Sequence, residues 1–472
     1  MLTRLPSPAP APPDFSPELL RRFDSPGPRY TSYPTADRFV DTFGATDCHR
    51  ALARTGPGGS LDRASPLSVY VHVPFCESVC YYCACNKVIT RHHERATEYL
   101  DALQAELALV QGSLGGGRVL SQLHLGGGTP TFLSDAELQR LLDMLQDVFR
   151  IESGAELSIE VDPRTVSTQR LGFLRQLGFN RLSFGVQDFD PQVQQAVHRV
   201  QPYDSVRELI VSARELGFTS MNVDLIYGLP RQTPTSFART LQQVAALRPD
   251  RIALYAYAHL PQRFKPQRRI VTAELPDAGQ RMHMLSDAIF SFDAQGYDYI
   301  GMDHFALPDD ALAVAKREGR LHRNFQGYST QPDCDLIGLG VSAIGRVGAS
   351  YYQNAKSLPE YYDALRQGQL PVQRGLTLSR DDEMRRTIIM ALMCQGRLEF
   401  EPIEVAFGVR MHDSFAPELQ QLEPLAEAGL LDIGPGAIQL TPAGWYVVRA
   451  VAMVFDRYVQ SDRQRERYSR II

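Results

Sequence analysis

From residue 67 onward, short apolar runs alternate with longer stretches in which apolar residues recur at the spacing of an α-helix. The apolar runs have the length of strands and occupy 67–73, 119–125, 157–161, 181–186, 221–227 and 252–257. The helical stretches between them lie near 94–112, 134–149, 165–177, 203–216 and 233–247. Strands that alternate with helices are typical of a parallel sheet built from βα units. The pattern therefore predicts an α/β fold, a partial parallel (β/α)6 TIM-like barrel.

Local signals mark the ends of several predicted helices. The second helix begins at Ser134, which is followed three residues later by Glu137, and this pair predicts a capping box. Gly178 and Gly217 stand where the third and fourth helices should end. Glycine is common there because the residue after a helix often adopts a left-handed conformation.

Polar or glycine-rich residues follow the end of every predicted strand. In order along the chain they are four cysteines, the glycines 126–128, Glu160 with the 162–164 segment, Gln187, Asp224 and the 258–261 segment. The active sites of parallel barrels lie at the carboxyl ends of the strands. We therefore expect one active site across this edge of the sheet.

The pattern changes beyond residue 270. A helix is expected near 273–295, a further strand near 299–305, and a hairpin where Gly434-Pro435-Gly436 separates two apolar runs. Helices with such a hairpin resemble a winged-helix module, but their mixed charge favours a lid or packing role over nucleic-acid binding. The predicted organisation is a disordered proline-rich tail (1–21), an N-terminal arm (22–60), the barrel core (61–300), a barrel extension with active-site loops (301–375) and a mainly helical C-terminal domain (376–472).

The cysteines after the first strand carry the strongest chemical signal. Cys76, Cys80 and Cys83 follow the spacing C-x3-C-x2-C, and Cys85 comes two residues later. Three neighbouring thiolates can bind three irons of a 4Fe–4S cluster and leave the fourth iron free for another ligand. A disulfide framework is disfavoured because the chain is long and has no secretion signal. A zinc knuckle stays an alternative, although no second C-x2-C or H-x3-H pair stands at finger spacing.

Two glycine motifs do not fit nucleotide-binding patterns. The glycines 126–128 are not followed by G-K-[ST], which excludes a P-loop. Gly338-x-Gly340 lacks the clear βαβ unit and the ribose-binding acid of a dinucleotide site. The first motif therefore indicates a close backbone approach to another ligand, with a tight turn between strand and helix as the alternative.

Composition narrows the class of protein. The chain has 472 residues, 44% hydrophobic residues and a net charge of −5, which is ordinary for a globular protein and gives no electrostatic reason to expect nucleic acid as a partner. We see no signal peptide and no run long enough for a membrane-spanning helix. The expected compartment is the cytoplasm.

Taken together, these motifs resemble those of the oxygen-independent coproporphyrinogen III oxidases, a family of the radical S-adenosylmethionine (SAM) superfamily. The similar segments run in the same order over about 22–460 and include Y-V-H-V-P-F-C-x3-C-x2-C-x-C-N-K, L-G-G-G-T-P-T, I-E-V-D-P-R, F-G-V-Q-D-F, D-L-I-Y-G-L-P and H-R-N-F-Q-G-Y. Tyr82 and Ala84 depart from the family pattern, in which phenylalanine and glycine are common.

The resemblance implies one 4Fe–4S cluster, two SAM molecules and the residues that bind them. By resemblance Cys76, Cys80 and Cys83 bind iron, whereas Cys85 lies near the second cofactor site. Cys85 is also the one candidate for a catalytic side chain. The implied cofactor contacts are Tyr70, Tyr82, Cys85, Gly126, Gly127, Gly128, Glu160, Gln187, Arg199, Asp224, Ala258 and Ile344.

The implied reaction uses a 5′-deoxyadenosyl radical to convert two propionates of coproporphyrinogen III into vinyl groups without oxygen, giving protoporphyrinogen IX for haem biosynthesis. The implied partners are this substrate and an electron donor such as flavodoxin or ferredoxin, and a monomer is expected. The tetracarboxylate substrate makes Arg29, Arg263, Lys265, Arg268, Arg269 and Arg323 candidate contacts. A haem chaperone of the same superfamily is the alternative, against which Cys85 and the N-terminal arm argue.

Overall fold

A single curved sheet organises the molecule. The computed structural model describes residues 22–23, 27–55, 66–115, 117–331 and 333–461. Six neighbouring parallel strands follow one another in chain order, as predicted: β1 (Leu67–Val73), β4 (Arg118–Gly127), β5 (Phe149–Val161), β6 (Arg181–Gln187), β7 (Ser220–Tyr227) and β8 (Arg251–Ala256). The predicted α/β fold with a partial parallel barrel is confirmed.

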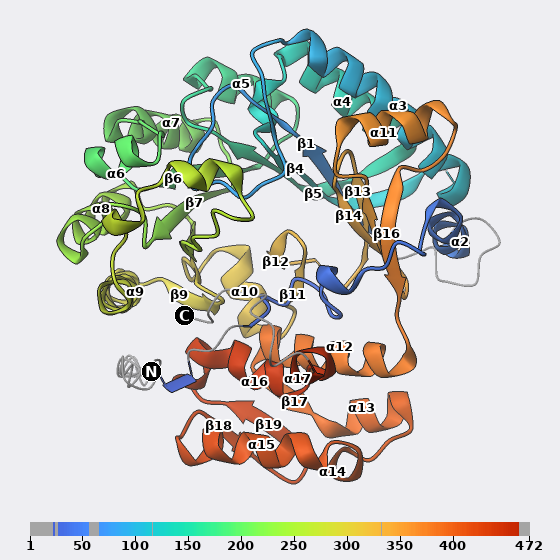
Figure 1. The fold of residues 1–472 in the computed structure, drawn as a ribbon, viewed down its shortest axis with the longest axis vertical. Helices are drawn as coiled ribbons and strands as arrows, with labels where there is room; N and C mark the ends of the chain where they lie inside the picture. The colour runs from blue at the N-terminus through green and yellow to red at the C-terminus, as the bar shows by residue number, and fades with distance from the viewer. Residues whose placement is uncertain (1–21, 24–26, 56–65, 116, 332, 462–472) are drawn as a thin grey trace, which may run out of the picture.

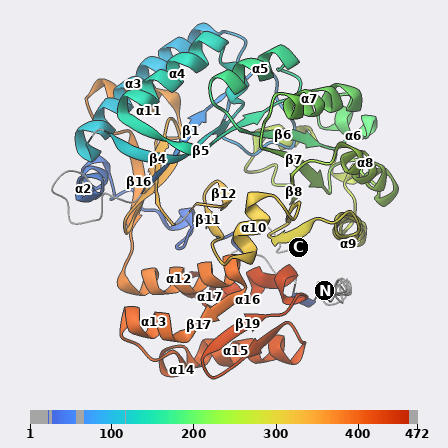
Figure 2. The same ribbon diagram turned by 180° about the vertical axis from the view of Figure 1, so that it is seen from behind.

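Helices on the outer face connect these strands (Figures 1 and 2). The connecting helices are α3 (Glu94–Leu114), α4 (Asp135–Val148), α5 (Thr168–Gln176), α6 (Pro191–Ala196), α7 (Tyr203–Glu215) and α8 (Pro234–Leu247). The predicted capping box is present, because Ser134 Oγ accepts from Glu137 N and the Glu137 carboxylate accepts from Ser134 N. Gly178 and Gly217 follow α5 and α7 with φ angles of 97° and 78°.

The sheet extends beyond the six predicted strands on both sides. After α9 (Ala278–Ala294), the expected strand near 299–305 is two antiparallel strands, β9 (Asp298–Gly301) and β10 (His304–Ala306), joined by Met302 and Asp303 in left-handed conformations. On the other side, β13 (Asp335–Leu339) pairs in parallel with β1. It is followed by the antiparallel strands β14 (Ile344–Val347), β15 (Ser350–Asn354) and β16 (Val372–Thr377), with α11 (Leu358–Arg366) between the last two.

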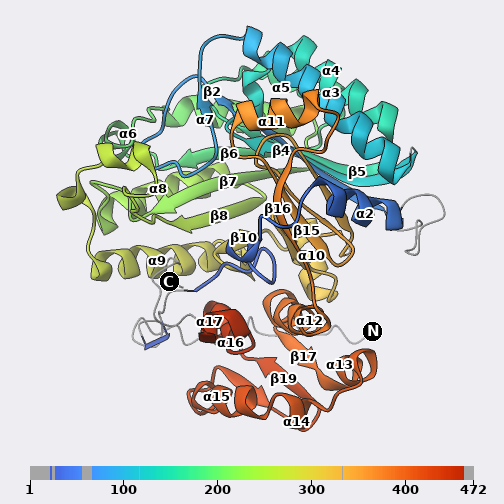
Figure 3. The same ribbon diagram turned by 45° about the vertical axis from the view of Figure 1, so that its right-hand side comes forward.

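The C-terminal part of the chain forms a helical unit with a small sheet (Figure 3). The predicted hairpin is present as β18 (Leu431–Ile433) and β19 (Ala437–Leu440), and β19 also pairs with β17 (Arg397–Glu399). The helices are α12 (Arg380–Gln395), α13 (Phe400–Phe407), α14 (Met411–Ser414), α15 (Ala416–Glu427), α16 (Val448–Val454) and α17 (Arg457–Ser461). Within the described ranges no helix combines the length and apolar character needed to cross a membrane.

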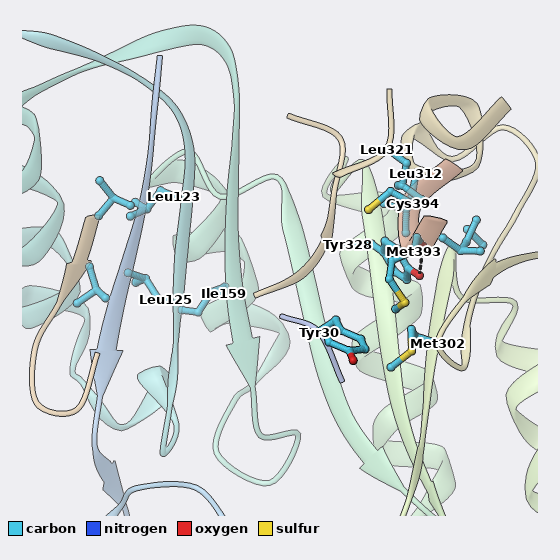
Figure 4. Close-up of a cluster of buried hydrophobic side chains, with 14 of the residues drawn as sticks. Tyr30, Leu123, Leu125, Ile159, Met302, Leu312, Leu321, Tyr328, Met393 and Cys394 are labelled. Carbon is cyan, nitrogen blue, oxygen red and sulfur yellow. Dashed lines mark hydrogen bonds between the residues drawn. The ribbon is translucent and has the colours of Figure 1, made fainter. Parts of the chain in front are cut away.

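Two short elements join the barrel to the C-terminal unit. They are α10 (Ala311–Arg317) and the hairpin of β11 (His322–Asn324) and β12 (Gly327–Ser329), which lie between the two parts in Figure 2. Tyr328 of β12 donates to Met393 O of α12 at 2.9 Å, as drawn in Figure 4. Lys316 of α10 lies over the Trp445 ring, with its ammonium 4.0 Å from the centroid.

The N-terminal arm runs between the same two parts (Figure 1). After α2 (Ala45–Thr55), the structure describes no residue until 66; the predicted disordered tail 1–21 also lies outside the described residues. Tyr30 is fully buried and donates to Asp456 at 2.9 Å, while Arg449 donates to Pro28 O at 3.1 Å. The arm is therefore part of the interface between the barrel and the C-terminal unit.

A buried carboxylate holds the loop after β13. Glu106 of α3 accepts hydrogen bonds from Gly340 N at 2.8 Å, Tyr361 Oη at 2.6 Å and Asn354 Nδ2 at 2.6 Å. Burial, only partly offset by these three neutral donors, raises the pKa of Glu106 from 4.5 to about 7. The folded state therefore prefers a protonated Glu106 over a range of pH in which an exposed glutamate is ionised.

This pKa predicts a pH-dependent effect of Glu106→Gln on stability. The pKa of Glu106 is higher in the folded state than in the unfolded chain, so the unfolded chain releases this proton at lower pH. The free energy of unfolding of the wild type therefore falls as the pH rises from 4.5 to about 7, by about 3 kcal/mol in total. The glutamine cannot ionise, so the unfolding free energy of the variant relative to wild type should rise by about 2 kcal/mol between about pH 5 and about pH 8. Urea unfolding at both pH values measures this, with exposed Glu152→Gln as the control. Parallel pH curves for wild type and the Glu106 variant would refute the assignment.

Candidate functional site

A cavity of about 260 Å³ lies at the carboxyl ends of the parallel strands. Its wall combines the loop after β1 with the ends of β4, β5, β6 and β7, as expected for a one-sided site. The predicted residues that line it are Cys76, Cys80, Tyr82, Cys83, Cys85, Gly127, Gly128, Glu160, Gln187, Arg199 and Asp224.

Cys80 lies between two guanidinium groups. Arg199 Nη1 is 3.4 Å and Arg164 Nη2 is 3.5 Å from Cys80 Sγ. Asp162 accepts from both arginines, at 3.3 Å from Arg199 and 2.7 Å from Arg164. Although burial acts in the opposite direction, the two arginines lower the pKa of Asp162. The arrangement places positive charge beside one sulfur and fixes that charge with the partly buried carboxylate of Asp162.

The other two cysteines of the triplet have different surroundings. Lys87 Nζ donates to Cys83 O at 3.2 Å and to Cys85 O at 3.3 Å, which closes the end of the cysteine loop. The hydrogen bond from the Cys85 thiol, opposed by burial and aided by the Lys87 ammonium, lowers the pKa of Cys83. Cys76 is half-buried in β2 (Phe75–Cys76), which pairs with β3 (Val88–Ile89).

The glycines at the end of β4 allow a close backbone approach. Gly127 N donates to Glu160 Oε2 at 3.1 Å. A Cβ atom on Gly128 would lie 2.6 Å from the carbonyl oxygens of both Pro74 and Phe75, so no side chain fits there. A Cβ atom on Gly126 would lie 3.0 Å from the Glu160 carboxylate. These contacts bring the glycines, Glu160 and the chain leading into Cys76 together.

The ends of β6 and β7 supply two further polar side chains. Gln187 has a φ of 68°, next to a register shift between β6 and β7, and such irregularities redirect a side chain at a functional site. Asp224 accepts from Asn222 at 2.8 Å and from Ser183 at 3.1 Å. Burial, followed by the nearby charge of Glu160, raises the pKa of Asp224 to about 6.

Four predicted residues lie outside this cavity wall. Tyr70 and Gly126 contact its edge, because a Cβ on Gly126 would meet both the Tyr70 ring and Glu160. Ala258 is joined to Tyr82 through Gln267, whose side-chain amide donates to the carbonyl oxygens of both. Ile344 begins β14, two strands away from β1, and does not line the cavity.

Several residues of the site had no predicted role. The sequence indicates Asp162 and Arg164 only as part of the segment after the third strand, yet both line the cavity with Ser183, Lys87 and Tyr255. Their position directly after a strand end was the available signal. No three His, Cys, Asp or Glu side chains of the described residues converge as ligands of a single metal ion. A 4Fe–4S cluster requires a different arrangement, because each cysteine binds a different iron.

Residues 70–244 match the family model of the radical SAM superfamily. The match begins within β1 and covers the cysteine loop and the ends of β4, β5, β6 and β7. The fold and site therefore define a radical SAM protein, a class whose cofactors are a 4Fe–4S cluster and SAM. Residues 378–447 match the model of the HemN C-terminal domain.

Comparison over the whole chain identifies the family. The chain is 48% identical over 459 residues to the oxygen-independent coproporphyrinogen III oxidase of Escherichia coli K12, covering 97% of this chain and 99% of the relative. The enzyme of that name from Pseudomonas aeruginosa PAO1 is 48% identical over 457 residues, covering 96% and 98%. The solved structure of coproporphyrinogen III oxidase (HemN) from E. coli, described as a radical SAM enzyme, matches with a TM-score of 0.89 and 48% identity over 94% of this chain and 99% of that chain. The chain belongs to the oxygen-independent coproporphyrinogen III oxidase family, as the sequence motifs predicted.

Proposed function

We propose that this protein catalyses the oxygen-independent oxidative decarboxylation of coproporphyrinogen III. Two propionate side chains become vinyl groups: each gives one hydrogen atom to the 5′-deoxyadenosyl radical and one further electron to an external one-electron acceptor, and each releases CO2. The observation that carries the proposal is the combination of a cavity lined by three suitably spaced cysteines with 48% identity over 97% of the chain to an enzyme of this name.

The residues of the cavity fit the cofactors of this class. Cys76, Cys80 and Cys83 are free thiols on one wall and would hold the cluster. Carboxylates accept hydrogen bonds from ammonium and hydroxyl groups, which suits Glu160 and Asp224 to the polar groups of SAM. Arg199 would pair with its carboxylate. Tyr82, the glycines 126–128, Gln187 and Ala258 complete the proposed contacts, and a second SAM molecule would lie near Cys85, with Tyr70 and Ile344 among the proposed contacts.

When bound, the cluster and SAM supply a 5′-deoxyadenosyl radical that can take a hydrogen atom from a propionate. The protein's own residues bind, orient and exclude solvent. Asp162 keeps Arg164 and Arg199 beside Cys80, and Glu160 fixes the glycine backbone through Gly127 N. The reaction needs no side chain that acts as an acid or a base. Cys85 is the one side chain that we propose as a candidate for a chemical role.

We further propose a cytoplasmic location, a monomeric enzyme and an external one-electron donor such as flavodoxin or ferredoxin. Of the four cysteines that line the cavity, three are proposed as cluster ligands, and the single remaining thiol, Cys85, cannot supply electrons repeatedly. An external donor must therefore reach the cluster from the protein surface.

Anaerobic reconstitution with iron and sulfide, followed by assay with coproporphyrinogen III, SAM and a reductant, tests the proposed reaction. We expect protoporphyrinogen IX, two molecules of CO2 and 5′-deoxyadenosine, all absent when SAM is omitted. Stoichiometric haem binding without decarboxylation would instead support the haem chaperone.

A further inference from the structure

A basic surface segment lies next to the cysteine loop. The stretch 257–273 includes Arg263, Lys265, Arg268 and Arg269 and no acidic residue, although the chain as a whole has a net charge of −5. All four side chains are exposed. We call these four residues the basic rim. None of them lines the cofactor cavity, so their charge faces solvent.

The basic rim is attached directly to the loop that contains the cysteines. The Arg269 guanidinium lies over the Tyr81 ring, 5.2 Å from its centroid. Gln267, between the arginines, donates to Tyr82 O at 3.0 Å. Ile270 belongs to a small apolar cluster against which Tyr81 and Tyr82 pack. Tyr81 and Tyr82 separate Cys80 from Cys83 in the sequence. The rim segment therefore contacts the two residues that lie between two proposed iron ligands.

The surface around the rim also exposes apolar side chains. Leu260 and Val271, in the same segment as the rim, are 40% and 55% exposed. Exposed apolar residues among like charges are typical of a surface that binds another protein, in which charge guides the encounter and apolar contact stabilises it.

The positive field extends beyond the rim. Burial, followed by the charges of Arg374 and Arg263, lowers the pKa of Lys356. The backbone of Lys356 in turn accepts from Asn86 Nδ2 at 2.9 Å, next to Cys85. Cationic groups therefore approach the cysteine loop from two separate segments of the chain.

We propose that the basic rim is the docking surface for an acidic, low-potential one-electron carrier protein. This inference rests on the proposed function, which requires electrons from outside. The step transfers one electron from the reduced carrier, which is oxidised, to the cluster held by Cys76, Cys80 and Cys83, which is reduced. The rim offers charge complementary to an acidic carrier and a direct connection to the cysteine loop through Arg269 and Gln267. The same side chains were candidate substrate contacts in the sequence, but their position outside the cavity wall favours a protein partner.

The test compares two reductants on the reconstituted enzyme. In the rim variant, Arg263, Lys265 and Arg268 are replaced by glutamine, and Arg269 is kept so that its contact with Tyr81 is preserved. Stopped-flow absorbance follows cluster reduction by flavodoxin hydroquinone and, separately, by dithionite. We expect reduction by flavodoxin to slow about tenfold or more at low ionic strength, whereas reduction by dithionite changes by less than about twofold. The wild-type rate with flavodoxin should fall steeply with added salt, and the variant rate should not.

A matched control variant replaces Arg366, Arg397 and Arg410, three exposed arginines on other surfaces, with glutamine. The cluster of this control variant should be reduced as fast as the wild-type cluster by both flavodoxin and dithionite. Equal flavodoxin rates for wild type and the rim variant, or equal slowing in the control variant, would overturn the docking proposal. A wild-type cluster that dithionite does not reduce would count against the proposed function instead, so the two failures are distinguishable.

Discussion

Replacing Cys83 with serine is expected to abolish the cluster, whereas replacing Cys85 with serine is expected to keep it. Both residues line the same cavity, and the neighbouring Cys85 thiol lowers the pKa of Cys83. Only the first three cysteines have the spacing that can place one thiolate on each of three irons. We expect iron in Cys83→Ser to fall from about four atoms per chain to less than about one. Cys85→Ser should retain the iron and the electron paramagnetic resonance signal of the reduced cluster, yet form protoporphyrinogen IX at no more than a trace rate.

Cys334→Ser provides the control for this pair. Cys334 lies outside the cavity, with its sulfur 3.1 Å from Ser68 Oγ, so its loss should leave both iron content and product formation unchanged. Iron and sulfide analysis, spectroscopy and product chromatography on the same anaerobic samples separate cluster assembly from turnover. Loss of the cluster in Cys85→Ser, or its retention in Cys83→Ser, would contradict the assignment of three ligands and one additional cysteine.

The repeating part of the fold could be predicted from the sequence because its signals are local. Strand β1 is bounded as expected, and the capping box of Ser134 and Glu137 sets the start of α4. The carboxyl ends of parallel strands meet at one edge, so residues such as Glu160 and Asp224 could be expected at one site without knowledge of their distances. The cysteine spacing then indicated the ligand chemistry, three thiolates for an iron–sulfur cluster.

Features that depend on contacts between distant segments could not be predicted in this way. The parallel strand β13 contains only a short apolar run, and its pairing with β1 joins residues 67 and 335. Asp303 adopts a left-handed conformation that its sequence does not require. The position of Arg164 beside Cys80 depends on where Asp162 directs its side chain. Sequence spacing identifies which residues take part, but tertiary packing decides which atoms meet.

Gly128→Ala is expected to disable the site through one added methyl group. The new Cβ would lie 2.6 Å from the carbonyl oxygens of Pro74 and Phe75, which are backbone atoms and cannot rotate away. Gly128 N and Thr129 N also donate to Val73 O and Phe75 O, so the two segments cannot separate without losing these bonds. We expect a loss of about 1–3 kcal/mol in the free energy of unfolding. SAM affinity should weaken at least about tenfold, because displacement moves the glycine backbone away from Glu160.

Gly112→Ala tests whether this effect belongs to the site. Gly112 lies in α3, and an added Cβ there meets no atom within 4 Å, so the substitution should stabilise the protein by about 0.5–1 kcal/mol. Equilibrium binding of SAM and urea unfolding on both variants provide the comparison. If Gly128→Ala bound SAM as tightly as Gly112→Ala, the backbone around Gly128 would have to yield by several tenths of an ångström without moving the ligand. The glycine run would then serve only as a turn, and the proposed contacts at 126–128 would have to be withdrawn.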